Sequence, residues 1–237
     1  MKTDAAILNE LQKPLVVTDI EIPSLKPGQV LVDISYSGIC HTQLSECKGN
    51  RGEDKFLPHC LGHEGSGVVR EIGSGITKVK VRDRVIISWI KGTGADVSST
   101  VYQWGNTRVN AGGVTTFSRQ SVISENRLTV IPNDISMEAA ALIGCAVPTG
   151  MGAVLNTAHP RPGQSIAIFG TGGIGLCAVA GCAAALNYGS DRQSDARGKR
   201  HAFRQHSEQR QRPGGLSGQN GNRRRLQQCA DLYAGRR

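Results

Sequence analysis

The chain has 237 residues, enough for one large domain or two small ones, and only 4% of its residues are aromatic. Its net charge of +9 is concentrated at the end of the chain. Residues 187–237 hold 12 Lys and Arg against 4 Asp and Glu, whereas residues 1–186 hold 16 against 15. The net charge therefore gives no reason to expect that the first four fifths of the chain bind nucleic acid.

Seven cysteines and the N-terminal residues bear on the cellular compartment. The cysteines are odd in number and share no repeated spacing, which argues against a secreted disulfide framework and leaves metal ligation or burial. No apolar stretch reaches the roughly 18 residues of a membrane span, and no basic region followed by an apolar core marks a signal peptide. We therefore expect a cytoplasmic protein with no membrane partner.

Short strands separated by turns are predicted from residue 1 to about residue 75. Apolar residues alternate along residues 28–36, which is typical of a half-buried strand, and this strand ends just before Cys40. Residues 67–72 and 79–90 predict two further β segments. Several short strands with few helices predict a compact β-barrel or sandwich of about 130 residues.

Residues 91–113 are polar and rich in Gly, Ser, Thr and Asn, and they predict a long loop or a lobe without cysteine. Residues 122–131 return to a strand-like pattern. Ser136 then predicts the N-cap of a helix over residues 137–143, with an acidic residue in its first turn. A second helix is predicted from Thr149 to about Ala158.

A new unit is predicted from the apolar segment Ser165–Phe169, which leads into the glycine loop Gly170–Gly175 and an alanine-rich helix to about Leu186. In a strand–loop–helix context, G-x-G-x-x-G allows the backbone to approach a pyrophosphate at the helix N-terminus. Such turns also occur for purely steric reasons. The flanking strand and helix favour a dinucleotide site.

After Leu186 the pattern breaks. Only 11 of the residues 187–237 are apolar, while Arg, Gln, Gly and Ser dominate, and no strand or amphipathic helix of convincing length can be drawn. A doubly wound sheet needs several more strands than the chain offers here.

Four short motifs follow one another along the chain: Gly38-Ile39-Cys40-His41-Thr42, Gly62-His63-Glu64, Gly144-Cys145 with Thr149-Gly150, and the loop Gly170–Gly175. Taken alone, a tripeptide such as Gly62-His63-Glu64 is more often an ordinary loop. In this order, the four motifs resemble the zinc-dependent alcohol dehydrogenases of the medium-chain dehydrogenase/reductase superfamily, and the resemblance runs to about residue 186.

The resemblance implies an α/β plus β fold class. A GroES-like, β-rich catalytic domain would span residues 1–158, and residues 159–186 would form the first β-α unit of an NAD-binding Rossmann domain with a doubly wound parallel sheet. That Rossmann domain is incomplete, and residues 187–237 would be a basic tail that is disordered or aberrant.

The resemblance also implies one catalytic zinc ion, whose protein ligands by motif match would be Cys40, His63 and Cys145. A fourth position would stay open for water or substrate. Two thiolates neutralise the metal's double charge, and zinc lowers the pKa of a bound water, and by analogy of an alcohol, toward ~7. NAD would accept the hydride, with NADP as the alternative.

Further roles follow from motif match. The Thr42 hydroxyl would carry the substrate proton outward, Glu64 would tune or briefly replace a zinc ligand, and Trp89 would form a wall of the substrate pocket. The cofactor-binding positions would be His41, Thr149, Gly170, Gly172, Gly173, Ile174 and Gly175. From sequence alone, a turn residue explains Thr42 equally well and a core aromatic explains Trp89 better. Cys60 is interpreted as a buried thiol rather than a ligand.

Three departures from the family pattern stand out. The stretch 91–113 lacks the four cysteines that hold a second, structural zinc in many members, so one zinc is predicted. His41 and Gln43 stand where other members often place a phosphate-binding Arg and an Asp, and Ser45 where some have a relay His. The third departure is the missing second strand with its acidic tip: Asp191 and Asp195 lie near the expected distance, but no apolar strand precedes either.

A shifted reading frame or a damaged gene after codon 186 would explain this break. Sequencing the coding DNA tests the hypothesis, which fails if neither alternative frame restores apolar strands and an acid-tipped second strand.

The predicted function is NAD-linked oxidation of a small-molecule alcohol to an aldehyde or ketone, impaired here because half a Rossmann domain cannot cover its own sheet. Homo-oligomers are usual in the family, but the contacting strands would lie in the absent part. The alternative is a non-catalytic, zinc-binding β domain with a disordered basic tail. Arg223–Arg225 is the only basic run in that tail and lacks aromatic neighbours, so a solvated charge run is favoured over a nucleic-acid site. A zinc-free quinone reductase is disfavoured because all three ligand positions are filled.

Overall fold

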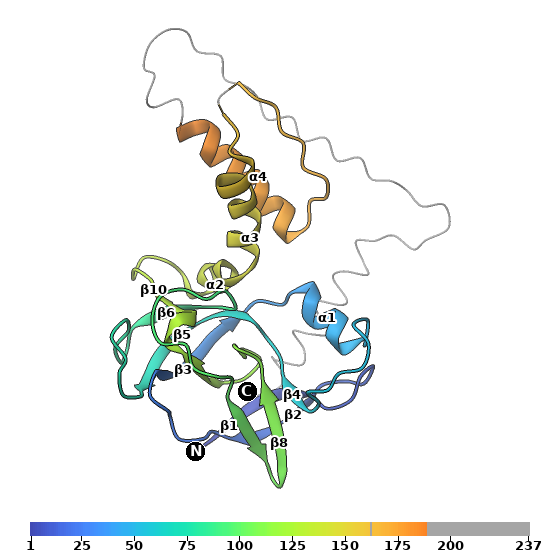
Figure 1. Cartoon of the computed structure of the whole chain (residues 1–237), viewed down its shortest axis with the longest axis vertical. Helices are drawn as coiled ribbons and strands as arrows, with labels where there is room; N and C mark the ends of the chain where they lie inside the picture. Colours follow the sequence, from blue (N-terminus) through green and yellow to red (C-terminus); the bar gives the residue numbers. More distant parts are fainter. Residues whose placement is uncertain (162, 189–237) are drawn as a thin grey trace. The chain divides into compact units, whose positions relative to one another are not determined.

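The computed structural model describes residues 1–161 and 163–188 (Figure 1). The predicted basic tail lies outside the described residues except for residues 187 and 188, which end the last helix. Asp191, Asp195 and Arg223–Arg225 also lie outside them. The interpretations of these positions stay predictions.

The elements run in the following order along the described chain. The strands are β1 (Lys2–Leu8), β2 (Val16–Glu21), β3 (Gln29–Ser37), β4 (His59–Cys60), β5 (Glu64–Ile72), β6 (Arg84–Ser88), β7 (Val101–Trp104), β8 (Thr107–Ala111), β9 (Gln120–Ser124) and β10 (Leu128–Val130). The helices are α1 (His41–Cys47), α2 (Met137–Ala141), α3 (Ala146–Gly152) and α4 (Gly173–Tyr188). Two 3-10 turns, η1 (Glu125–Arg127) and η2 (Leu142–Gly144), and a π-helical segment, η3 (Ala153–Ala158), complete the list.

The strands form two sheets. One closes into a barrel in the order β1-β2-β7-β8-β4, and the other is a five-stranded sheet in the order β10-β6-β5-β3-β9. Nearly all neighbours are antiparallel; β4 and β8 are parallel. This arrangement confirms the predicted β-rich domain.

Strand β3 lies at the centre of the second sheet, between β5 and β9, and contacts two hydrophobic cores. Val30 and Val32 pack with Ile87 and Leu128 in one core, while Leu31 packs with the barrel residues in the other. The sequence predicted a half-buried strand. Its first half is instead buried on both faces, because the barrel covers the side on which Leu31 lies.

Residues 91–113 were predicted to form a long loop or a lobe, and the long-loop alternative is wrong, because β7 and β8 form an antiparallel hairpin there. Gly105 and Asn106 connect the two strands, and Gly105 has a positive φ of 57°, which a two-residue hairpin turn requires. The hairpin supplies two strands of the barrel. Tyr102 is fully buried, and its Oη accepts a hydrogen bond of 2.9 Å from the Val122 N–H.

The helices differ in part from the predicted ones. Helix α2 begins as expected, with Ser136 Oγ accepting a hydrogen bond of 3.2 Å from the Ala139 N–H. The second helix starts earlier than predicted, at Ala146, directly after Cys145. Helix α1 was not predicted, because its seven residues are too few to show an apolar period.

The strand predicted over Ser165–Phe169 is not formed. These residues are extended but largely exposed, and Phe169 is 97% exposed. A parallel strand needs hydrogen-bonding neighbours on its edges, and none lies beside this segment within the described residues. Helix α4 follows the glycine loop as predicted and packs against α3, while the Rossmann domain itself stays a prediction.

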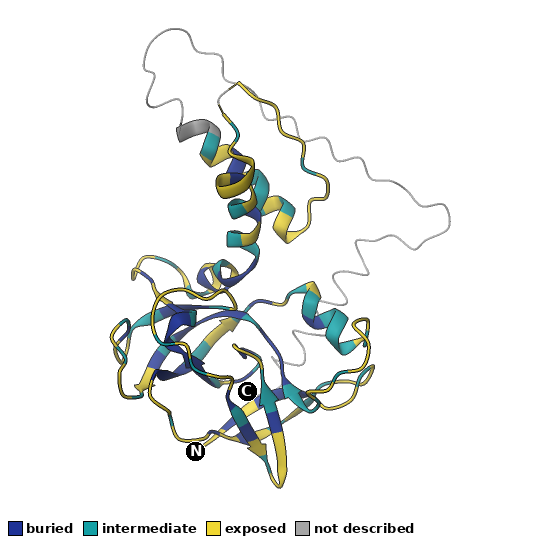
Figure 2. Cartoon of the chain, in the orientation of Figure 1, coloured by how far each residue is buried: buried dark blue, intermediate teal, exposed yellow. Residues whose placement is uncertain are grey.

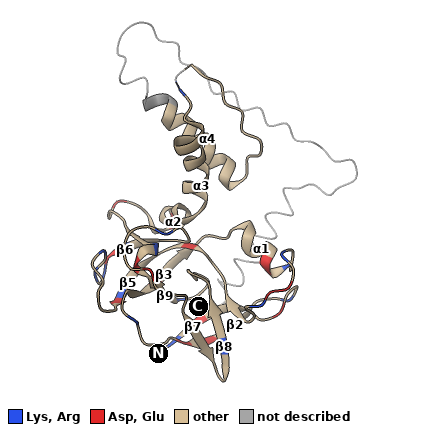
Figure 3. Ribbon diagram, viewed as in Figure 1, with Lys and Arg blue, Asp and Glu red and all other residues tan. Residues whose placement is uncertain are grey.

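Burial and charge differ between the β domain and the described residues that follow it. Buried residues gather in the strands, whereas the segment before α4 is exposed (Figure 2). Acidic and basic residues are interspersed over the β domain, and residues 139–160 and 163–188 contain none (Figure 3). No single described helix is long and apolar enough to cross a membrane. One bent pair, Met137–Gly144 with Ala146–Ala158, meets the length and composition criteria alone.

Candidate metal centre

Cys40, His63 and Cys145 come together in the structure although 105 positions separate the first from the last. One potential ligand atom from each residue lies within 4.8 Å of the other two. It is the one group of three or more such ligands found among the described residues. An imidazole nitrogen with two thiolate sulfurs is a donor set that suits zinc.

Strands β3 and β5 bring the first two residues together. The strands pair antiparallel, with Ser37 opposite Gly65, so that Cys40 follows the end of β3 where His63 precedes the start of β5. Gly62 has a φ of +93°, and a Cβ at this position would lie 2.3 Å from Thr116 Oγ1. A glycine is therefore required in the turn that presents His63.

Cys145 is held in place by the residue before it. A Cβ on Gly144 would lie 2.3 Å from the Ile87 carbonyl oxygen and 2.8 Å from Glu64 Cβ, so this backbone packs directly on β6 and β5. Ser88 Oγ donates a hydrogen bond of 2.6 Å to the Gly144 carbonyl. The close approach places Cys145 beside His63.

His63 offers one nitrogen to a ligand. Its Nδ1 contacts the side-chain amide of Gln43, while its Nε2 is buried and has no hydrogen-bond partner among the described residues. Burial, and secondarily the positive charge of Arg51, lower the pKa of His63. A neutral imidazole with a buried, unpartnered Nε2 fits a metal ligand.

The two sulfurs differ in exposure. Cys145 is 8% exposed. Burial raises the pKa of its thiol to about 11, and the nearby charges of Glu64 and Cys40 act in the same direction, whereas a hydrogen bond from the Trp89 indole acts to lower it. Cys40 is half-buried, and its thiol donates a weak hydrogen bond of 3.7 Å to Thr42 Oγ1. A cation placed between the sulfurs would favour their thiolate forms. The donor set therefore fits a zinc ion.

Glu64 lies behind the centre rather than in it. Its side chain is 3% exposed, and burial raises its pKa to about 7, although the backbone N–H groups of Ala146 and Cys145 act in the opposite direction. Its Oε2 has no partner within the described part of the chain. The Glu64 carboxyl thus contacts the backbone at Cys145, and Glu64 itself directly follows His63 in the sequence.

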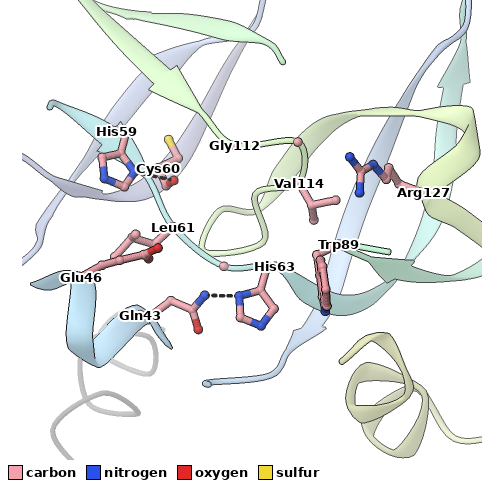
Figure 4. Close-up of a pocket in the computed structure, with 12 residues that line it drawn as sticks. Gln43, Glu46, His59, Cys60, Leu61, His63, Trp89, Gly112, Val114 and Arg127 are labelled. Atoms are coloured by element: carbon pink, nitrogen blue, oxygen red, sulfur yellow. Dashed lines mark hydrogen bonds between the residues drawn. The ribbon is translucent and has the colours of Figure 1, made fainter. Parts of the chain in front are cut away.

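A cavity of about 290 Å³ adjoins His63. Trp89 and Gln43 flank the His63 ring from opposite sides in Figure 4. Trp89 is 50% exposed, so the core-aromatic interpretation is wrong, and its side chain lines the cavity. Its role as a wall of a substrate pocket stays a prediction. The other lining residues are Glu46, His59, Cys60, Leu61, Gly62, Gly112, Gly113, Val114 and Arg127.

The predicted cofactor positions are mostly exposed. His41 begins α1 at the surface, and the Thr149 hydroxyl donates a hydrogen bond of 2.7 Å to the Cys145 carbonyl. Gly170 and Gly172 precede α4, and Gly173, Ile174 and Gly175 form its first residues. Helix α3, which carries Thr149, packs against α4, and a Cβ on Gly150 would lie 2.2 Å from the Ile174 carbonyl oxygen. Their roles in cofactor binding stay predictions.

Two side chains near the centre were not assigned a role from sequence. Gln43 is 4% exposed and contacts both Cys40 and His63; its position three residues after the N-cap Cys40, where Glu and Gln are favoured, was the available signal. Arg127, in η1, also lines the cavity, and no pattern in the sequence indicated this position. His59 pairs with Asp54 at 2.8 Å, and the buried-thiol interpretation of Cys60 is confirmed, since it is 2% exposed in the barrel core.

Comparison with known proteins identifies the β domain. Residues 26–133 match the family described as the Alcohol dehydrogenase GroES-like domain. The chain is 37% identical over 206 residues to S-(hydroxymethyl)glutathione dehydrogenase from Synechocystis sp., covering 76% of this chain and 56% of the relative. The enzyme of the same name from Photobacterium damsela subsp. piscicida shows the same identity and coverage.

Solved structures share the fold. An alcohol dehydrogenase zinc-binding domain protein from Burkholderia ambifaria superposes with a TM-score of 0.71 at 25% identity, and benzyl alcohol dehydrogenase from Acinetobacter calcoaceticus with a TM-score of 0.68 at 24% identity. Each alignment covers 78% of this chain and 56% of the other. The chain thus spans about half the length of the proteins it matches.

The family match covers the segments that contain Cys40 and His63, and the longer alignments are long enough to include a third ligand position. The chain has a GroES-like domain and brings one nitrogen and two sulfur ligands together. It belongs to the zinc-dependent alcohol dehydrogenase family of the medium-chain dehydrogenase/reductase superfamily.

Proposed function

We propose that the chain binds one zinc ion through Cys40, His63 and Cys145, and that this centre serves NAD-linked oxidation of an alcohol to an aldehyde or ketone. The observation that carries the proposal is the approach of three ligand atoms within 4.8 Å, with His63 Nε2 buried and unpartnered. Two similar proteins support the proposal by their names, S-(hydroxymethyl)glutathione dehydrogenase and benzyl alcohol dehydrogenase.

Bound zinc would act as a Lewis acid toward the hydroxyl oxygen of the substrate. Thr42 would carry the hydroxyl proton away at Oγ1, which lies 3.7 Å from the Cys40 sulfur. Trp89 would orient an apolar substrate body and exclude water from the side of the cavity next to His63. Glu64, buried behind the ligands, would hold their backbone in position and tune the ligand set.

The hydride acceptor would be NAD, with NADP as the alternative, bound by the glycine loop and the start of α4. His41, Thr149, Gly170, Gly172, Gly173, Ile174 and Gly175 are the candidate contacts. Ser165–Phe169, which would be the first strand of that site, is exposed and unpaired within the described part of the chain. We therefore expect this chain to bind zinc but to turn over weakly.

Metal analysis tests the metal centre directly. One zinc per purified chain is expected, and Cys40→Ser, His63→Ala and Cys145→Ser should each lower that ratio while Cys177→Ser does not. Cys177 is a suitable control because it is half-buried in α4 and lies outside the ligand group. Zinc retained in all three ligand variants would refute the centre.

An assay of NADH formation with primary alcohols separates the two candidate functions. Zinc-dependent NADH formation that is lost in His63→Ala would assign a dehydrogenase. Stoichiometric zinc without any NADH would favour the alternative, a non-catalytic zinc-binding β domain.

A further inference from the structure

Gln43 is a buried amide placed between two groups of the candidate metal centre. Its Oε1 accepts a hydrogen bond of 3.0 Å from the backbone N–H of Cys40, and its Nε2 contacts Nδ1 of His63 (Figure 4). With 4% of its surface exposed, the side chain has little access to water that could replace either contact.

The two ends of an amide are not equivalent. The carbonyl oxygen can only accept hydrogen bonds and the NH2 group can only donate them. Because the Cys40 N–H is a donor, it fixes the oxygen on its own side and turns the NH2 group toward His63. His63 must then present a lone pair at Nδ1, so the single proton of its neutral ring lies on Nε2.

This tautomer opposes metal binding. Nε2 is the buried, unpartnered nitrogen, and a nitrogen that carries a proton cannot coordinate a metal. Coordination through Nε2 requires the proton to lie on Nδ1. The Nδ1–H would then face the NH2 group of Gln43, and two hydrogen-bond donors would meet without an acceptor. Rotating the amide by 180° satisfies Nδ1 but sets the NH2 group against the Cys40 N–H. Either way, one buried N–H loses its partner.

We infer that Gln43 is a positioning residue that holds His63 in the tautomer protonated at Nε2 and thereby lowers the metal affinity of the centre. The inference rests on the metal centre of the proposed function. It predicts that a side chain of the same shape with two accepting oxygens would relieve the conflict, because it could accept from the Cys40 N–H and from the His63 Nδ1–H at once.

Gln43→Glu is that side chain. It keeps the number of heavy atoms, and Glu is as suitable as Gln three residues after an N-cap, so the start of α1 should be preserved. Partners that orient a metal-bound histidine typically change metal affinity 10–100-fold. We expect Gln43→Glu to bind zinc about 10–100-fold more tightly than the wild type.

A competition titration with a zinc chelator measures this gain. Ser45→Glu is the matched charge control, because it adds the same charge to the same helix two residues further on, about 200° around the axis from Gln43. It should raise affinity far less than Gln43→Glu. Equal affinities in the wild type and Gln43→Glu, or equal gains in the two Glu variants, would overturn the inference.

A second measurement needs no metal and separates the role of Gln43 from the fate of the metal centre. The 15N–1H correlations of the His63 ring in metal-free protein, assigned by their loss in His63→Asn, report which nitrogen carries the proton. We expect Nε2–H in the wild type and Nδ1–H in Gln43→Glu. A wild-type ring protonated at Nδ1 refutes the inference even if zinc binds, whereas failure of Cys40→Ser to weaken zinc binding would refute the metal centre alone.

Discussion

Gly38 and Glu64 lie in direct contact, with no room for a side chain at residue 38. A Cβ there would come within 2.5 Å of the Glu64 carboxyl carbon, and the Gly38 N–H donates a hydrogen bond of 3.1 Å to the Glu64 carbonyl. Since Gly38 is two residues before Cys40 and Glu64 directly follows His63, the contact joins the two segments that carry the first two candidate ligands.

Gly38→Ala should therefore destabilise the protein and disturb the candidate centre. The added methyl group must displace a buried carboxyl, and such overpacking costs typically about 1–3 kcal/mol. Urea unfolding measures the loss. Gly92→Ala is the control, because a Cβ at Gly92 would meet its nearest atom at 3.4 Å; equal stability losses in the two variants would contradict the expected role of the Gly38–Glu64 contact.

Zinc should protect Cys40 from alkylation. Cys40 is half-buried, and a metal-bound thiolate is withdrawn from reaction with a maleimide. Peptide mass spectrometry should show slower labelling of Cys40 in the presence of zinc and unchanged labelling of Cys177, which is also half-buried. Labelling of Cys40 that is indifferent to zinc would argue against its role as a ligand.

Cobalt should quench the fluorescence of one of the two tryptophans. The Trp89 indole contacts the Cys145 sulfur, whereas Trp104 packs against the core of the barrel. Co²⁺ accepts the same nitrogen and sulfur ligands as zinc and quenches nearby indoles. Quenching should persist in Trp104→Phe and disappear in Trp89→Phe; the reverse pattern would place the metal elsewhere.

Acid should remove a stabilising contribution of Glu125. Glu125 is 1% exposed. Burial acts to raise the pKa of its carboxyl, but hydrogen bonds from the N–H groups of Ala95, Lys78 and Thr77 outweigh burial and hold the pKa below its usual value. A lowered folded-state pKa stabilises the protein above the unfolded pKa of about 4.5, and this stabilisation is lost as the pH falls through the folded-state pKa.

Glu125→Gln should accordingly cost about 1–3 kcal/mol in unfolding free energy at pH 7, because its NH2 group cannot accept from the backbone donors. The difference from the wild type should shrink as the pH is lowered below about 4.5. Unfolding curves over a pH series measure it, with Glu71→Gln, on the exposed end of β5, as the control. A difference that stays constant with pH would contradict the prediction.

Local patterns predicted the elements whose signals lie within a few residues. The N-cap Ser136, the alternation along β3 and the glycine loop before α4 each depend on neighbours in sequence, and each element was found where expected. The hairpin of β7 and β8 was missed because its strands have only four and five residues, although the Gly105-Asn106 pair that connects them is a recognised turn signal. Ser165–Phe169 shows the opposite error, since an apolar run forms a strand only when another strand pairs with it.

The sequence by itself determined the family and the residues that could hold a metal, because the order and spacing of Cys40, His63 and Cys145 within their motifs are local properties. Only the tertiary structure decided that their ligand atoms meet within 4.8 Å, that Trp89 lines a cavity rather than a core, and that Gln43 stands between Cys40 and His63. These relationships depend on the pairing of β3 with β5 and on the packing of Gly144 against β6. Contacts between residues so distant in sequence leave no periodic trace in the chain, so the hydrogen-bond conflict at His63 becomes visible only once the strands are paired.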